Sequence, residues 1–277
     1  MFKQFLLALT LVLATTATAS ASITRTRVEN FLVEPGTHIE VKINGGPIIV
    51  KVGPPGQVHI ELIQTVGTDS EKVADNLIAK TSIIEQNGQR IRVVLESEGY
   101  NLSWSWLHSW LHGDRGVRLI VPAKVDLNLD ASGGPIKVDG EIQGELRANT
   151  SGGPISLTGG TGKLDLDTSG GSISVDRVFH QIHADTSGGS IRIGYVSPDV
   201  MDVDADTSGG GISIGLDPAG NYDLHADASG GSVNVKELQF EASRMDRTHA
   251  EGKVNRGGAR VRADTSGGNV EIHAAHL

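Results

Sequence analysis

Apolar and polar residues alternate in paired short segments on either side of a Ser-Gly-Gly tripeptide that recurs through the second half of the chain. The clearest copy, Asp167 to Val175, reads Asp-Thr-Ser-Gly-Gly-Ser-Ile-Ser-Val. Alternation with period two predicts two short strands, each with one buried face, joined by a corner at the glycine pair. The tripeptide begins at Ser132, Ser151, Ser169, Ser187, Ser208, Ser229 and Ser266.

Subtraction of these positions gives intervals of 19, 18, 18, 21, 21 and 37 residues. Self-similarity at a near-constant period of this size is typical of a solenoid, in which each unit buries its apolar face against its neighbours. We therefore predict an all-β, single-stranded parallel β-helix with about 18–21 residues per rung. We interpret the glycines as corner residues with positive φ, and the last interval as holding a degenerate rung around Gly257-Gly258.

Equivalent apolar positions should stack into interior columns. Before the corner these are Leu127/Leu146/Leu164/Ile182/Val203/Leu224/Val261 and Leu129/Ala148/Leu166/Ala184/Ala205/Ala226/Ala263; after it they are Ile136/Ile155/Ile173/Ile191/Ile212/Val233/Val270 and Val138/Leu157/Val175/Ile193/Ile214/Val235/Ile272.

The first half contains one early rung and an insertion. The rung surrounds Asn44-Gly45-Gly46, and a strand is expected over 58–66. Thr68 and Glu71 have the spacing of a capping box, which predicts a short helix after them. A hairpin is expected over 82–96 around Asn87-Gly88. We assign 22–277 to one β-solenoid domain, with the first rung, helix, hairpin and a Trp-rich insertion in 22–122 and the regular rungs in 123–277.

The N-terminus has the pattern of a secretory signal peptide. A lysine, Lys3, precedes an apolar run from Phe5 to Ala14, and small residues follow up to Ala21. We predict that 1–21 is a signal peptide cleaved after Ala21 or Ala19, with no transmembrane segment afterwards. The chain has no cysteine, which excludes disulfides and a lipidated Cys. These features favour bacterial export, to the periplasm first and to the cell surface or medium as alternatives.

The net charge and the absence of known motifs exclude several classes of function. The net charge of -9 and the lack of a basic stripe exclude nucleic acid as a partner. The sequence has no nucleophile elbow, phosphate-binding loop or dinucleotide fingerprint, so we predict no cofactor and no catalytic residue.

The first rung, the helix and hairpin, the strand ending at Val121-Pro122 and the serial Asp-Thr-Ser-Gly-Gly-x-Ile units resemble the bacterial "putative adhesin" family of β-strand-repeat proteins. That family has no known function and is similar to adhesin-head β-helix domains. The resemblance implies an exported right-handed β-helix without catalytic residues.

An outward column of carboxylates precedes the corners, with Asp167, Asp185, Asp206 and Asp227 as candidate residues. Adjacent carboxylates repel, so an offsetting interaction is required. We favour Asx turns, in which each carboxylate accepts hydrogen bonds from corner amides. The alternatives are a divalent-cation or glycan face, or a polysaccharide-acting β-helix enzyme using the Asp165–Asp227 face with two carboxylates about 5 to 9 Å apart.

Two further groups of residues stand out. Trp104, Trp106 and Trp110 either cover an apolar edge or bind a partner, an envelope protein or glycan. The pairs His108/His112 and His180/His183 suit a metal only on a helix, so we predict no metal site.

The interpretation that results is an exported, non-enzymatic, adhesin-like structural or interaction protein of the cell envelope. Local function is expected where the repeat is broken, at the Trp insertion, the Pro-bearing loops or the last interval.

Overall fold

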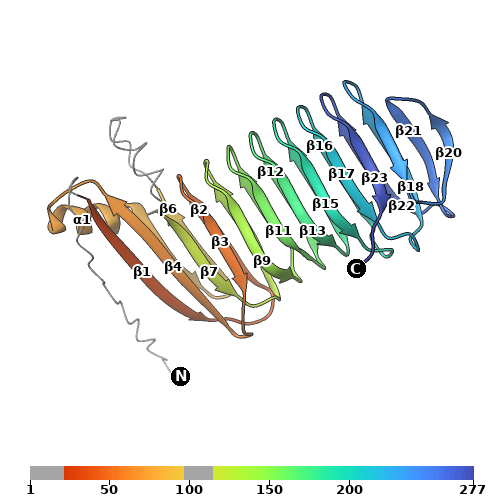
Figure 1. The fold of residues 1–277 in the computed structure, drawn as a ribbon. Helices are drawn as coiled ribbons and strands as arrows, with labels where there is room; N and C mark the ends of the chain where they lie inside the picture. The colour runs from red at the N-terminus through yellow and green to blue at the C-terminus, as the bar shows by residue number, and fades with distance from the viewer. Residues whose placement is uncertain (1–21, 97–114) are drawn as a thin grey trace.

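The computed structural model describes residues 22–96 and 115–277 as an elongated stack of strands in two long sheets (Figure 1). Each regular rung contributes one strand to each sheet, with the Ser-Gly-Gly corner between the two strands. Most neighbouring strands in both sheets are parallel. The all-β solenoid predicted from the repeat is confirmed.

Sheet A has 11 strands, in the spatial order β1 (Ile23–Leu32), β4 (Gln57–Val66), β7 (Gly116–Val121), β3 (Ile48–Val52), β9 (Ile136–Ile142), β11 (Ile155–Gly160), β13 (Ile173–Val178), β15 (Ile191–Val196), β17 (Ile212–Leu216), β23 (Val270–Ala274) and β19 (Val233–Lys236). Sheet B has 12 strands, in the order β20 (Phe240–Met245), β21 (His249–Val254), β18 (Tyr222–Ala228), β22 (Ala259–Thr265), β16 (Asp202–Thr207), β14 (Gln181–Thr186), β12 (Lys163–Thr168), β10 (Leu146–Thr150), β8 (Val125–Ala131), β2 (Thr37–Ile43), β6 (Arg90–Leu95) and β5 (Ser82–Asn87).

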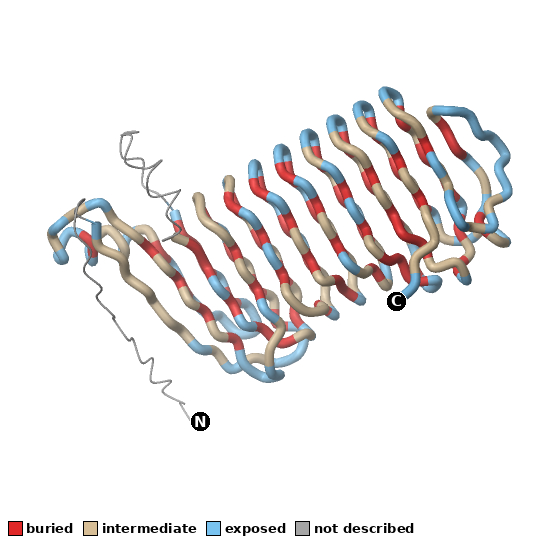
Figure 2. The backbone as a smooth tube through the Cα atoms, viewed as in Figure 1, coloured by how far each residue is buried: buried red, intermediate tan, exposed pale blue. Residues whose placement is uncertain are grey.

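The core is the space between the two sheets. Buried and exposed residues alternate along the strands, as Figure 2 shows. The predicted interior columns are buried in every rung, apart from Val235 near the end of sheet A, which is only partly buried. Like residues lie opposite one another, for example Leu146 opposite Leu164 in β10 and β12. The alternation in the sequence therefore identified the core.

The rungs do not stack in chain order at the C-terminal end. Strand β22 lies between β16 and β18, so Val261 is opposite Val203 on one side and Leu224 on the other. In sheet A, β23 lies between β17 and β19 in the same way. The last rung in the sequence is thus inserted between the two that precede it.

The prediction of a degenerate rung in the last interval is wrong. Strands β20 and β21 instead form an antiparallel hairpin that pairs with β18 at the end of sheet B. Gly257-Gly258 lies in the turn between β21 and β22, where Gly257 has a φ of 75°. The side chains of β20 are mostly exposed, so this strand adds an edge to the sheet and little to the core.

Antiparallel strands also end the stack on the other side. Strand β1 pairs with β4, β5 pairs with β6, and α1 (Glu71–Thr81) joins the two sheets. The helix and hairpin were predicted, but the capping box was not formed: Thr68 Oγ1 accepts from the Ser70 amide at 3.1 Å. The hairpin turn is Gly88-Gln89, one residue later than expected, because Asn87 still pairs with Arg90. Within the described ranges, no helix is long and apolar enough to cross a membrane.

The repeated corner glycines do not have positive φ, so that part of the prediction is wrong. Positive φ occurs in the first corner, at Gly45 and Gly46. In the later corners the second glycine is required because a Cβ there would overlap the preceding rung. At Gly171, for example, it would collide with the carbonyl oxygen of Gly153. The glycine pair is therefore a condition for close stacking.

A buried threonine closes most of these corners. Thr168 Oγ1 donates to Gly153 O of the previous rung at 3.0 Å and accepts from the Gly171 amide at 3.2 Å. Thr186, Thr207 and Thr265 form the same pair of hydrogen bonds. The prediction of Asx turns is wrong: within the described ranges the preceding aspartates accept no hydrogen bond from corner amides. Where the next residue is Thr168, Thr186, Thr207 or Thr265, the threonine hydroxyl accepts from the corner amide instead.

Adjacent glycines of one corner should differ in their tolerance of alanine. A Cβ at Gly189 would overlap Gly171 O, whereas one at Gly188 would meet its nearest atom at an ordinary 3.5 Å. We expect Gly189→Ala to destabilise the protein by about 1–3 kcal/mol, as overpacking does. Gly188→Ala should leave the melting temperature nearly unchanged in thermal denaturation followed by circular dichroism. Equal losses from the two variants would contradict the steric explanation.

Candidate functional face

The outward column of sheet B that contains the aspartates is the main candidate site, and we call it the ladder. The register of the strands fixes its spatial order as Lys42, Asp130, Asn149, Asp167, Asp185, Asp206, Asp264, Asp227 and His249. Neighbouring strands are about 4.8 Å apart, so six carboxylates are brought close together in one line. The structure shows what offsets their repulsion.

At the N-terminal end the ladder begins with a cation and an amide. Lys42 lies opposite Asp130 in the register of β2 and β8. On the other side, Asn149 Nδ2 donates to Asp130 Oδ1 at 3.1 Å. Asp130 is therefore flanked by two groups that do not repel it.

Near the C-terminal end Arg262 binds three carboxylates. Its guanidinium donates to Asp206 Oδ2 at 2.6 Å and to Asp204 Oδ1 at 3.1 Å, and it also donates to Asp264. Burial lowers the pKa of Arg262, but the three carboxylates together raise it above its ordinary value. The neighbouring Arg260 forms a bidentate pair with Asp202, with both contacts at 2.9 Å.

These arginines explain the inserted rung. In chain-order stacking, β18 would place Asp223 opposite Asp202 and Asp227 opposite Asp206. Instead, β22 separates the two acidic strands and supplies Arg260 and Arg262. Charge complementarity therefore favours the observed order, since the apolar columns alone accept either.

The middle of the ladder is the least compensated part. Asp185 lies between Asp167 and Asp206. Burial raises the pKa of Asp185, the charges of Asp167 and Asp206 raise it further, and His183 acts in the opposite direction. Burial also raises the pKa of Asp264, in spite of its contact with Arg262.

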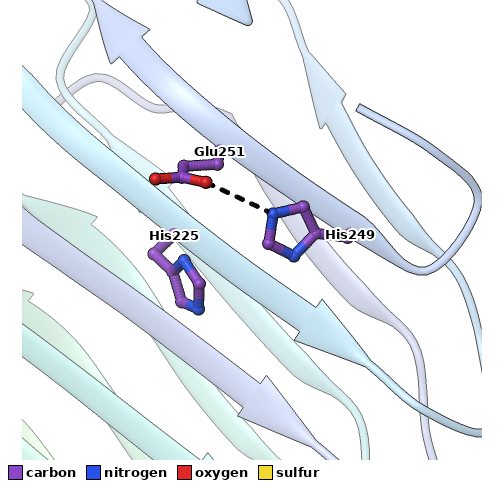
Figure 3. Close-up of side chains that lie close together, drawn as sticks. All are labelled: His225, His249 and Glu251. Carbon is purple, nitrogen blue, oxygen red and sulfur yellow. Dashed lines mark ion pairs between the residues drawn. The ribbon is translucent and has the colours of Figure 1, made fainter. Parts of the chain in front are cut away.

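At the end of the ladder, β18 and β21 bring two histidines together with two carboxylates. His249 Nδ1 is 3.0 Å from Asp227 Oδ1, and His225 Nε2 is 3.0 Å from Asp227 Oδ2. His249 Nε2 is 3.6 Å from Glu251 Oε2. Figure 3 shows both imidazole rings and the Glu251 carboxylate gathered over these strands.

The surface beside the ladder is shallow and polar. One depression of about 300 Å³ is lined by aspartates, threonines and serines of the C-terminal rungs, including Asp185, Asp206 and Asp264. A similar depression lies near Asp130 and Asp167 at the other end. Because it recurs along the repeat, this shape belongs to the corner architecture.

Sequence reasoning located part of this site. Asp167, Asp185 and Asp206 are consecutive as expected, whereas Asp264 separates Asp227 from Asp206. Asp165 is 3.8 Å from Arg147, and His183 is 3.6 Å from Asp204.

The described residues do not include five of the candidates, Trp104, Trp106, Trp110, His108 and His112. The roles of Arg262, His249 and Glu251 were missed because they follow from the inserted rung and the antiparallel hairpin.

The fold and this face define the class: a two-sheet β-solenoid whose outward side chains repeat with its rungs. The chain belongs to the Toastrack DUF4097 family, whose profile matches residues 116–273. This confirms the resemblance inferred from the repeat.

Solved structures also match this chain over most of its length. One is a "putative adhesin" from Bacteroides fragilis, with 9% identity over 89% of this chain and 96% of that chain and a TM-score of 0.44. Another, from Parabacteroides distasonis, has 8% identity over 89% and 96% of the two chains, with a TM-score of 0.36. A "putative cell adhesion protein" from Clostridium sporogenes has 11% identity over 90% and 99%, with a TM-score of 0.35. No curated protein matches the sequence.

Removing Arg262 should expose the repulsion that it offsets. We expect Arg262→Met to lower stability at neutral pH by about 1–2 kcal/mol, because Asp204, Asp206 and Asp264 lose a shared charged donor. Arg260→Met on the same strand is the control, since the Arg260 side chain is 61% exposed and solvent screens its pair with Asp202, so its loss should matter less. Thermal denaturation measures both, and a larger loss for Arg260→Met would contradict the assignment.

Replacing Asp185 by asparagine should stabilise the protein at neutral pH. The change copies the arrangement at Asn149 and removes a like charge, which is worth about 0.2–1 kcal/mol across a strand pair. Because the pKa of Asp185 is raised, the folded state binds this proton more tightly. Wild-type stability from this group is thus present at low pH and lost as pH rises through the folded pKa.

The advantage of Asp185→Asn should therefore shrink as pH falls from 7 toward about 4, near the ordinary pKa of aspartate. Melting temperatures of both proteins across this range measure the effect. Asp176→Asn, an exposed change on sheet A, is the control and should show no such trend. A constant difference between wild type and Asp185→Asn at all pH values would refute the explanation.

Proposed function

We propose that the protein is a non-enzymatic β-solenoid, exported to the bacterial envelope, where it works as a structural or interaction module. The observation that carries this proposal is that residues of the same chain compensate the charges of the ladder. Its acids are flanked or bound by Lys42, Asn149, Arg262 and two histidines of the same chain. A face that compensates its own charges at fixed positions is suited to rigidity and display.

The polysaccharide-acting enzyme has less support. Such an enzyme needs one carboxylic acid and one carboxylate at a defined separation around a bound sugar. Here the carboxylates form a line at strand spacing, and the depressions beside them are shallow and repeat along the stack. The nearby cation, Arg262, is already bound to three carboxylates of the chain itself.

Export and partner binding rest on the sequence. The segment 1–21 has the pattern of a signal peptide. The residues Trp104, Trp106 and Trp110 are our candidates for the contact with a protein or glycan of the envelope, because tryptophan is enriched at binding hot spots.

One experiment tests export and binding together. The full chain is expressed in a bacterium with its own N-terminus, and periplasmic protein is isolated by osmotic shock and weighed by mass spectrometry. We expect a chain that begins at Ser20 or Ser22. The protein is then immobilised and incubated with envelope extract or with purified cell-wall glycan.

Two triple variants distinguish the surfaces. Replacing Trp104, Trp106 and Trp110 with alanine should abolish capture of the partner, whereas Asp167→Asn, Asp185→Asn and Asp206→Asn together should leave it intact. Uncleaved protein in the cytoplasm would overturn the export proposal. If only the aspartate variant fails to capture the partner, the binding surface is the ladder and not the tryptophan segment. Release of reducing ends from an acidic polysaccharide would favour the enzyme.

A further inference from the structure

The end of the ladder differs from the rest of it because an antiparallel strand replaces the next rung. In the register of β18 and β21, Asp227 lies opposite His249 and His225 lies opposite Glu251. Two imidazoles and two carboxylates therefore share one outward patch, a combination that the repeat does not produce elsewhere along the ladder. The two rings are 5.2 Å apart at an angle of 78°.

His249 is the first candidate for a metal ligand in this patch. Its side chain is only 9% exposed, and its Nδ1 lies 3.0 Å from Asp227 Oδ1. A carboxylate only accepts hydrogen bonds, so this contact assigns a proton to Nδ1 and leaves a lone pair on Nε2 of the neutral ring. That Nε2 atom is buried and has no hydrogen-bond partner.

The atom that Nε2 faces makes this arrangement unfavourable without a cation. Glu251 Oε2 lies 3.6 Å away, so a lone pair points at a carboxylate oxygen. A positive charge between them, either a proton or a metal ion, resolves the repulsion. Asp227 bound to the other ring nitrogen is the arrangement by which a carboxylate orients a metal-binding histidine.

His225 completes a set of three ligands. One ligand atom from each of His225, His249 and Glu251 lies within 4.8 Å of the others. In a tetrahedral zinc site, bonds of 2.0–2.1 Å place ligand atoms about 3.3 Å apart. The separation of His249 Nε2 from Glu251 Oε2 is already close to this. His225 and Glu251, 42% and 55% exposed, have room to close the rest by side-chain rotation.

We propose that His225, His249 and Glu251 form a Zn²⁺ site, with water in the fourth position and Asp227 orienting both imidazoles. Two nitrogen ligands select zinc or a related transition metal over calcium, which prefers oxygen ligands. A second set, His225, Asp227 and Asp264, shares His225. It is the poorer site because Arg262 already binds Asp264. A bound ion would join β21 to β18 and so fix the terminal hairpin.

The test is calorimetry of the purified protein, free of any polyhistidine tag, titrated with ZnCl₂ and separately with CaCl₂. We expect one Zn²⁺ per chain and no comparable heat with Ca²⁺. Glu251→Gln and His225→Asn should each weaken Zn²⁺ binding at least about tenfold. Glu251 is exposed and His225 is only partly buried, so these variants should fold like the wild type.

Matched controls lie on the same sheet. His183→Asn replaces a histidine of the same outward column as His225, and Glu241→Gln replaces an exposed glutamate on β20. Both should bind Zn²⁺ within about twofold of the wild type. Hydrogen exchange of 240–254 should slow on adding Zn²⁺ in the wild type and stay unchanged in Glu251→Gln.

Three results would overturn the proposal. They are no heat at millimolar Zn²⁺, Zn²⁺ binding that Glu251→Gln and His225→Asn leave intact, and stronger binding of Ca²⁺ than of Zn²⁺. The first result, no heat with Zn²⁺, would mean that the positive charge between His249 and Glu251 is a proton and not a metal ion. The proposal does not depend on the function argued above, because zinc binding and partner capture are measured separately.

Discussion

The close approach of successive corners is the constraint on which the rest of this structure depends. Strands in both sheets must repeat about every 4.8 Å, so the corner between them must advance by the same distance. At Gly171 there is no room for a Cβ against the carbonyl of Gly153, and Thr168 hydrogen-bonds that carbonyl and the Gly171 amide. Rungs fixed in this way keep one register, which stacks like on like inside and outside the solenoid.

That register is favourable for the interior columns and unfavourable for the ladder. Apolar side chains gain from stacking on equals, whereas carboxylates repel one another. The chain offsets this repulsion at particular rungs, through Lys42 and Asn149 at one end and Arg262 near the other. The arginine strand is also the one placed out of chain order, between β16 and β18. Outward charges therefore select among rung orders that the interior residues Val203, Val261 and Leu224 leave equivalent.

The sequence predicted what depends on the repeat and missed what depends on its interruptions. Alternation and the Ser-Gly-Gly spacing identified the two strands of each rung, the core columns and the outward aspartates. They could not order the last rungs, because all of these carry the same apolar pattern. Arg260 and Arg262, at positions where β16 has Asp202 and Asp204, were the available signal. The threonine's part in the corner was hidden because alanine replaces it at Ala131 and Ala228, where the corner forms without the hydroxyl.

Different ligand types meet at the end of the stack because the repeat is interrupted there. Within the regular rungs, each outward position lies between its own equivalents, so the ladder presents acids in all of these rungs except that of Asn149. An antiparallel strand breaks this rule, since its sequence runs against the column and its residues are not repeat equivalents. Asp227 accordingly has Asp264 on one side and His249 on the other. Of the ladder positions, the one beside the terminal hairpin is therefore where a nitrogen-rich cation site can form without disturbing the repeat.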